Sequence, residues 1–322
     1  MEAARLAWNR WLALGRAGMD FYADPPGTRV EVARAFTPAL GGSAANIAVG
    51  IATLGGSAAL LTTLSHDAVG LFAASELKRY GIETQHVRFV TGEARTSLAV
   101  VATRNDDTQS VIYRNGAVDF KLGVDDVRAV AFEDFGGLVV TGTSLAVEPS
   151  RSATLLAAER ARAAGAVVVF DVDYRAYSWA SREDAAETCL RYAERSDIVV
   201  GNDDEFAVMA GLSGDGLALA RALAERCAIV VYKRGAKGSK TFAFGEAFEM
   251  GVFPVEPLKP TGAGDAFLAG FATGLAKVLD VKTAVARGSA AAAIVVTRVG
   301  CAPAMPDETE LEAFLARHPL AP

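Results

Sequence analysis

Short runs of aliphatic residues alternate along the chain with longer, alanine-rich amphipathic stretches. The short runs are apolar on both faces, as expected of strands buried inside a parallel sheet, and the stretches between them have helical periodicity. The predicted strands are residues 12–14, 58–62, 138–141, 167–171, 198–200 and 229–232. The predicted helices are residues 44–54, 69–80, 152–164, 185–195 and 217–227. This alternation indicates an α/β fold with a doubly wound, mostly parallel sheet covered by helices.

Two segments, residues 16–40 and 96–114, break this pattern. The first contains the turn sequence Asp24-Pro25-Pro26-Gly27, and the second has two strand-like runs joined by the polar turn Asn105-Asp106-Asp107. We expect them to form a small β-sheet lid over the carboxyl ends of the main strands, where α/β proteins bind ligands. The expected organisation is a single domain over residues 1–322, with a lid of about residues 16–40 and 96–120 and a core of residues 41–95 and 121–318.

The composition excludes several classes of partner. The chain has 322 residues, of which 51% are hydrophobic and 22% charged, so it can bury a substantial core. Its net charge of −6 argues against nucleic acid and anionic membranes as partners. Cys189, Cys227 and Cys301 are far apart in sequence, which favours a reducing, cytoplasmic location and argues against a zinc site. The longest uncharged apolar run, residues 290–296, is too short to cross a bilayer, and we expect no signal peptide.

The clearest chemical signal is the sequence Pro260-Thr261-Gly262-Ala263-Gly264-Asp265, which leads into an apolar helix. Backbone N–H groups at such a helix start point in one direction and form an anion site. Asp265 in the same turn is poorly placed to bind a phosphate but well placed to take a proton from an attacking hydroxyl. The pairing suggests phosphoryl transfer to an alcohol. The third glycine of a dinucleotide fingerprint is missing, and no P-loop sequence occurs.

A second glycine motif, Gly41-Gly42-Ser43-Ala44-Ala45-Asn46, opens the first long helix. Tight helix packing alone explains its small residues. Asn46, however, lies beside the open Gly-Gly backbone, and its amide can both donate to and accept from sugar hydroxyls.

With both motifs in this order and about 220 residues apart, the chain resembles the ribokinase-like, PfkB-type carbohydrate kinases. The resemblance covers nearly the whole length. It implies ATP as the phosphoryl donor, Mg²⁺ as cofactor and Asp265 as the general base. It also implies that the backbone of Gly262, Ala263 and Gly264 holds the phosphoryl group, and that Gly41, Gly42 and Asn46 orient the sugar.

Further stretches match the family. Asn202-Asp203-Asp204-Glu205 resembles its Asn-x-x-Glu motif, which implies that Glu205 holds Mg²⁺ through water while Asn202 caps a helix and touches phosphate; the same spacing is also a plain capping box. The resemblance further assigns six residues to nucleotide binding: Lys233, Arg234, Gly235, Gly238, Thr261 and Ser289. The first four of these could equally form a charged turn at the end of a strand.

Three residues bear on the choice of sugar. Asp20 resembles the acid that contacts sugar hydroxyls in this family. The alternative is that its carboxylate accepts a hydrogen bond from a backbone N–H of the turn at the strand end. Arg114 and Arg175 resemble arginines that face the substrate carboxylate in the family's sugar-acid kinases, and each alone could equally be a surface or ion-pair residue. An arginine fork suits a carboxylate because it donates two charge-assisted hydrogen bonds. The pair therefore favours an acidic sugar.

Within the family, the sequences Gly15-Arg16-Ala17-Gly18-Met19-Asp20 and Tyr113-Arg114-Asn115-Gly116-Ala117 look most like the kinases of 5-dehydro-2-deoxygluconate, which act in inositol catabolism. This implies phosphorylation of the C6 hydroxyl of that sugar acid. The alternatives are 2-dehydro-3-deoxygluconate, then fructose or ribose, and, in another class, a non-catalytic sugar sensor. A homodimer is expected by resemblance only.

One position departs from the family. Many members carry an Asp two residues before the motif threonine, where it helps to bind a monovalent cation, but this chain has Lys259 there. We hypothesise that the lysine ammonium removes the need for potassium.

Overall fold

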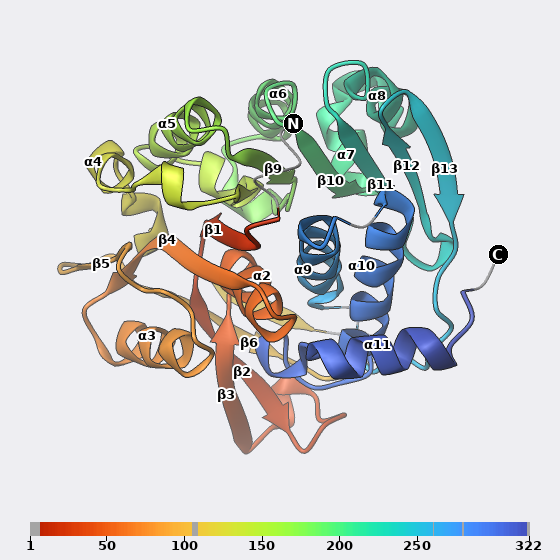
Figure 1. The fold of residues 1–322 in the computed structure, drawn as a ribbon. Coiled ribbons are helices and arrows are strands. Elements are labelled where there is room, and N and C mark those ends of the chain that lie inside the picture. Colours follow the sequence, from red (N-terminus) through yellow and green to blue (C-terminus); the bar gives the residue numbers. More distant parts are fainter. Residues whose placement is uncertain (1–6, 105–108, 260, 279, 321–322) are drawn as a thin grey trace.

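The computed structural model describes residues 7–104, 109–259, 261–278 and 280–320. Within these residues a large sheet runs through the molecule with helices on both sides (Figure 1). Its strands, in spatial order from one edge to the other, are β13 (Glu246–Met250), β12 (Ser239–Ala243), β11 (Ile229–Lys233), β10 (Ile198–Asn202), β9 (Val167–Asp171), β8 (Gly137–Thr141), β1 (Arg10–Leu14), β4 (Ser57–Ser65) and β5 (Val87–Val90).

The strands from β11 to β5 are parallel, and β12 and β13 add an antiparallel edge next to β11. All six predicted strands are present, most of them one or two residues longer than the aliphatic run. They are buried on both faces because successive side chains contribute to different cores: Trp11 and Ala13 of β1 pack on one side, and Leu12 and Leu14 on the other.

The helices divide between the two faces of the sheet. Those that contribute to the Trp11 side are α2 (Ser43–Thr53), α3 (Ala68–Arg79), α9 (Ala263–Ala276), α10 (Val281–Val296) and α11 (Glu308–Arg317). Those that contribute to the Leu12 side are α4 (Val124–Arg128), α5 (Ser150–Ala163), α6 (Arg182–Ala193), α7 (Asp203–Met209) and α8 (Gly216–Leu223). The predicted fold class is therefore confirmed.

Several one-turn 3₁₀ helices connect these elements. They are η1 (Val30–Val32), η2 (Val118–Lys121), η3 (Phe132–Asp134), η4 (Gly142–Leu145), η5 (Ala176–Ser178), η6 (Gly211–Ser213), η7 (Gly235–Lys237) and η8 (Ala302–Ala304). The predicted helix at residues 217–227 ends early, at Leu223, where the chain turns toward β11.

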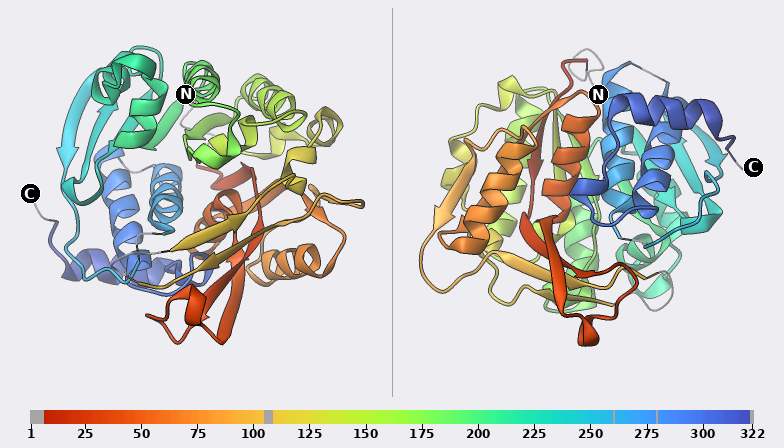
Figure 2. Two further views of the ribbon diagram at one scale, coloured as in Figure 1. Left: turned by 180° about the vertical axis from the view of Figure 1, so that it is seen from behind. Right: turned by 90° about the horizontal axis from the view of Figure 1, so that it is seen from below.

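The predicted small sheet is also present. Its strands, in spatial order, are β3 (Ala35–Gly41), β2 (Gly18–Asp24), β6 (Ser97–Val101) and β7 (Ser110–Tyr113). Because β2 follows β1 directly, the small sheet begins at the carboxyl ends of the parallel strands, and Figure 2 shows it projecting from the main body. The turn expected at residues 105–107 lies outside the described residues.

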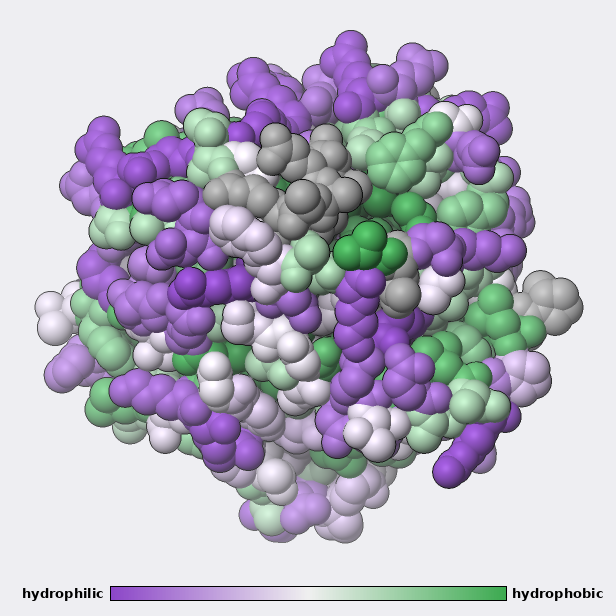
Figure 3. Space-filling view, viewed as in Figure 1, coloured by the Kyte–Doolittle hydropathy of each residue, from purple (hydrophilic) through white to green (hydrophobic). Residues whose placement is uncertain are grey.

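The surface is mixed. Polar side chains are spread over most of the face shown in Figure 3, and hydrophobic patches there are small and separate. Among the described residues, the model has no helix with both the length and the apolar character needed to span a membrane.

Candidate active site

A cavity of about 350 Å³ lies where the small sheet meets the carboxyl ends of the large sheet. Residues from the loop after β1, from β2, β6 and β7, from the start of α2, from the segment after β9 and from the start of α9 line it. Seven of the residues predicted from the sequence meet here: Asp20, Gly42, Asn46, Arg175, Thr261, Gly262 and Asp265.

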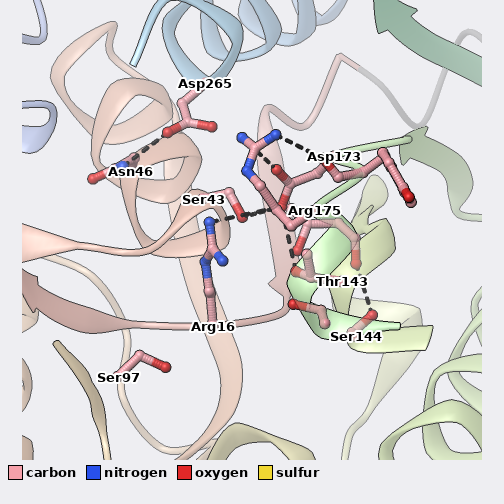
Figure 4. Close-up of polar contacts among 12 residues, drawn as sticks. Arg16, Ser43, Asn46, Ser97, Thr143, Ser144, Asp173, Arg175 and Asp265 are labelled. Atoms are coloured by element: carbon pink, nitrogen blue, oxygen red, sulfur yellow. Dashed lines mark hydrogen bonds and ion pairs between the residues drawn. The ribbon is translucent and has the colours of Figure 1, made fainter. Parts of the chain in front are cut away.

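The start of α9 carries Asp265 into this cavity. Gly262, the N-cap residue, has φ of 87°, a left-handed conformation that favours glycine. The helix then begins at Ala263, so the backbone N–H groups of its first turn have no partner within the helix. The Asp265 carboxylate accepts a hydrogen bond of 2.8 Å from Nδ2 of Asn46 on α2 (Figure 4). An anion site and a carboxylate thus share one helix turn.

The environment of Asp265 changes its acidity. Burial, followed by the neighbouring carboxylate of Asp173, raises the pKa of Asp265 to about 6, and the hydrogen bond from Asn46 opposes that rise. A carboxylate with a pKa near 6 is a stronger base than an exposed one and is still ionised at neutral pH.

The Gly41-Gly42 pair makes room for the acid on β2. A Cβ on Gly41 would lie 2.0 Å from Oδ1 of Asp20, and one on Gly42 would lie 2.6 Å from the carbonyl oxygen of Arg16. Gly42 also has φ of 95°. Burial raises the pKa of Asp20 although the Tyr22 hydroxyl donates to it at 3.1 Å. Both glycines are therefore required by the backbone and by the position of Asp20.

Asp173, which follows β9, is the centre of a buried polar network (Figure 4). Its carboxylate accepts hydrogen bonds from Ser43 at 2.7 Å and Thr143 at 3.3 Å, and pairs with Arg175 at 2.8 Å and Arg16 at 4.0 Å. Burial alone would raise the pKa of Asp173, but the arginines and Ser43 outweigh it and the pKa is lowered. Asp173 stays ionised and ties this first cavity to the large sheet.

Arg175 lines this cavity and also a second one of about 450 Å³ near the start of α7. Asn202 and Glu205 line the second cavity and form the capping box that the sequence allows: Asn202 Oδ1 accepts from the Glu205 N–H at 2.8 Å, and Glu205 Oε2 accepts from the Asn202 N–H at 2.7 Å. The other oxygen, Oε1 of Glu205, is 4.0 Å from Nη1 of Arg175. Burial raises the pKa of Glu205. The capping box therefore uses Oε2 of Glu205, and Oε1 is left to a long ion pair with Arg175.

The predicted nucleotide residues are less closely grouped. The Lys233 ammonium lies 3.5 Å from where a Cβ on Gly264 would be, and 5.6 Å from the Phe267 ring centre. Arg234 pairs with Glu249 at 3.1 Å, and Gly235 and Gly238 shape the tight turn that follows. Ser289 lies half-buried on α10. Lys233 and Thr261 lie at the start of α9, where Thr261 precedes the helix by two residues. Pro260 lies outside the described residues.

Arg114 is not among the residues that line either cavity. Arg114 is only 6% exposed. Its guanidinium pairs with Asp119, donates a hydrogen bond of 2.8 Å to the Ser178 hydroxyl and lies 4.2 Å from the centre of the Phe120 ring. The structure thus separates the two arginines that the sequence placed together: Arg175 reaches the cavity, and Arg114 is committed to internal partners.

Lys259 is fully buried, and its ammonium donates a hydrogen bond to the Thr261 carbonyl at the start of the glycine turn. Burial lowers the pKa of Lys259, whereas Cys301 and the carboxylates of Asp265 and Asp20 act in the opposite direction. Lys259 is therefore a buried donor that holds the backbone of the glycine turn through the Thr261 carbonyl.

Comparison with known proteins decides the family. The pattern of the pfkB family carbohydrate kinases matches residues 9–308. The chain belongs to the pfkB family of carbohydrate kinases. It is 39% identical over 310 residues to a 5-dehydro-2-deoxygluconokinase of Photobacterium profundum, with 94% of each chain covered. It is 36% identical to one from Geobacillus kaustophilus, over 96% of this chain and 94% of the relative.

Solved structures of two fructokinases have the same fold as this chain. The fructokinase of Xylella fastidiosa with bound ATP superimposes with a TM-score of 0.85 at 26% identity, over 96% of this chain and 98% of that one. A fructokinase double mutant from Vibrio cholerae O395, bound to fructose, ADP and potassium ion, gives 0.82 at 26% identity, over 95% and 98%. This kinase fold therefore extends over nearly the whole chain.

For a pfkB kinase, the buried acids at the end of β9 and the start of α7, Asp171 and Glu205, are the candidate groups near a metal. Asp171 at the end of β9 is buried, and burial raises its pKa well above the ordinary range; Lys233 lowers it, while Asp173, Glu205 and Asp265 raise it further. Such crowded carboxylates favour a cation. No cluster of three or more metal-ligating side chains occurs among the described residues, so a metal here would depend mostly on water and phosphate oxygens, as Mg²⁺ commonly does.

The structure adds site residues that sequence reasoning missed. Asp173 and Ser43 belong to the polar network, Asp171 is a buried acid whose charge interacts with that of Asp173, and Arg16 lines the first cavity. The two acids at the end of β9 were visible in the sequence as Asp171-Val172-Asp173, a polar pair directly after a buried strand. Arg16 had the same signal, since it follows β1 by two residues.

Proposed function

We propose that this pfkB kinase transfers the γ-phosphoryl group of ATP to the C6 hydroxyl of 5-dehydro-2-deoxygluconate. The observation that carries the substrate is the 36–39% identity, over at least 94% of this chain, to relatives that bear that kinase name. The cavity supports it, because a carboxylate base, hydroxyl-binding groups and arginines meet around one small space.

Asp265 is the proposed general base. It takes the proton from the sugar hydroxyl as that oxygen bonds to the γ-phosphorus and the bond to the ADP oxygen breaks. Asn46 holds the carboxylate in place, and Asp20, Gly41 and Gly42 orient the sugar. The hydrogen bond of 2.8 Å from Asn46 and the pKa near 6 support this role.

The first turn of α9 is the proposed anion hole. The N–H groups of Gly262, Ala263 and Gly264 hold the transferring phosphoryl oxygens, with the Lys233 ammonium beside them. The nucleotide extends along Asn202 and the turn that contains Arg234, Gly235 and Gly238, near Thr261 and Ser289; the family resemblance supports this placement.

Glu205 is the proposed anchor for Mg²⁺, through its oxygen Oε1 and a bound water. The ion would supply charge neutralisation of the triphosphate. The capping box fixes the side-chain conformation of Glu205. Arg175 lines both cavities, so its guanidinium can contact the phosphate groups of the bound nucleotide.

The test is a coupled ADP-release assay on the full chain with four acceptors. We expect the highest kcat/KM with 5-dehydro-2-deoxygluconate, at least about tenfold above 2-dehydro-3-deoxygluconate, because a misplaced hydroxyl or carbonyl leaves buried polar groups unpaired. A higher value with fructose or ribose would overturn the proposed substrate but not the kinase activity. ATP-independent binding without turnover would indicate a sensor.

We propose further that residues 16–40 and 96–120 act as the lid of a single domain over residues 1–322, and that two lids pair in a homodimer. The face of the small sheet opposite the cavity supports pairing, because it carries the partly exposed apolar side chains of Phe36, Val111 and Tyr113. The free thiols Cys189, Cys227 and Cys301 support a cytoplasmic location. Light scattering in solution measures the oligomeric state.

A further inference from the structure

Arg16 is a buried cation of the sugar cavity whose ion pair is a long one, 4.0 Å from Nη2 to Asp173. It follows β1, lines the cavity and is only 8% exposed. Its Nη1 atom is buried and has no hydrogen-bond partner among the described residues. A buried charged donor without a partner is costly, so its presence in a ligand cavity indicates that a ligand supplies the acceptor.

The neighbouring carboxylates are already engaged by other groups. Asp173 lies 4.0 Å from Nη2 of Arg16 but is held at 2.8 Å by Arg175 and at 2.7 Å by Ser43. Asp119 pairs with Arg114, and Asp20 accepts a hydrogen bond from Tyr22. Arg16 is thus left with a donor edge that no described carboxylate occupies, close to two other arginines.

The position of Arg16 matches one end of a linear substrate. In Figure 4 its guanidinium lies beside Ser43 and apart from the Asn46–Asp265 pair, and both Arg16 and Asp265 line the cavity. A sugar acid carries its carboxylate at the opposite end from its terminal hydroxyl. With the hydroxyl at Asp265, its carboxylate therefore points toward the Arg16 end of the cavity.

We infer that Arg16 binds the carboxylate of the acidic sugar and is the main determinant of the preference for an acid over a neutral sugar. This inference rests on the proposed function. The sequence favoured Arg114 and Arg175 for this role. Arg114 lines neither cavity, and Arg175, which does line the first one, is paired with Asp173 and holds it in its ionised state.

The experiment compares 5-dehydro-2-deoxygluconate with its neutral C1 amide on the full chain, by kcat/KM and by calorimetric Kd without ATP. We expect the wild type to prefer the acid by at least about tenfold, since a charge-assisted pair is lost with the amide. Arg16→Gln should lower that ratio by about tenfold or more. Arg16→Lys keeps the charge but not the fork, and should lower it by about threefold.

Arg114→Lys is the matched control, because it alters a buried arginine next to the cavity without removing a group that lines it. Its acid-to-amide ratio should stay within about 1.5-fold of the wild type. Circular dichroism melts verify folding, and Arg16→Lys decides the question if Arg16→Gln does not fold. An unchanged ratio in the folded Arg16 variant, or a wild-type ratio near one, overturns the inference. A wild type that turns over neutral hexoses but not the acid overturns the proposed substrate instead.

Discussion

Nδ2 of Asn46 on α2 donates a hydrogen bond of 2.8 Å to the Asp265 carboxylate on α9, although 219 positions separate the two residues. Each belongs to a different glycine motif at the start of its own helix. The bond holds the carboxylate at the cavity and opposes the effect of burial on its pKa. The two motifs therefore together position the proposed base, Asp265, at the start of α9.

Replacing Asp265 with Asn removes the base but preserves shape, since an amide oxygen can still accept from Asn46. We expect turnover to fall by about 10²–10⁴-fold, the usual contribution of a positioned base. ATP affinity should change little, because the backbone of the α9 turn is retained. Steady-state kinetics and calorimetric titration with ATP measure the two effects. A variant with parental turnover would rule out the base assignment.

The acidity of Asp265 also predicts a dependence on pH. With a pKa raised to about 6, the carboxylate is protonated and inactive as a base in acid. We expect kcat/KM to fall by about tenfold per pH unit below pH 6. The acid side of this profile reports the pKa of the base in the free enzyme. Asn46→Ala removes a bond that lowers this pKa, so its acid limb should move to higher pH. A wild-type profile flat from pH 5 to pH 8 would contradict the prediction.

The same shift affects folding. The folded state holds the Asp265 proton up to about pH 6, whereas an unfolded chain releases it near 3.8. The folded state therefore binds more protons between these values, and this group reduces stability as the pH rises through that window. Asp265→Asn should raise the melting temperature relative to the wild type at pH 7.5 and much less at pH 4.5. A gain of equal size at both values would mean that ionisation is not its source.

The fold could be predicted from sequence because each buried strand, such as residues 167–171 in β9, is apolar on both faces and flanked by amphipathic helices. The start of α9 was predictable for a local reason, since Gly262 needs a left-handed backbone. Partner choice among charged residues was not predictable. Arg114 pairs with Asp119 while Arg16 lines the cavity, and both positions are set by tertiary packing.

Arg114 and Asp119 give a prediction about stability. Both side chains are at most 5% exposed, so the loss of one leaves the other charged group buried without its partner. Arg114→Met should reduce the free energy of unfolding by about 3–5 kcal/mol. Chemical denaturation measures it. The double variant Arg114→Met with Asp119→Leu should recover part of the loss; an Arg114→Met protein as stable as the wild type would contradict the buried pair.

Lys259 predicts how the enzyme responds to monovalent cations. Its ammonium binds the Thr261 carbonyl from a fully buried position, while a fructokinase with the same fold was solved with potassium bound. The Lys259 side chain is part of the protein, so its ammonium, unlike a bound potassium ion, does not exchange with ions in the solvent. We expect turnover to change by less than about twofold when K⁺ replaces Na⁺ at constant ionic strength, because the charge is already present.

The variant Lys259→Ala turns this into a sharper test, because it removes the ammonium and leaves a buried space beside the Thr261 carbonyl. Turnover should fall by about tenfold or more as the turn loses its fixed partner, and NH₄⁺ or K⁺ should restore part of it where the larger tetramethylammonium ion does not. Lys259→Met, which fills the space without charge, is the control that no cation should rescue. If the wild type instead gains severalfold activity with K⁺, the lysine does not stand in for the ion, and its contact with Thr261 is a packing feature alone.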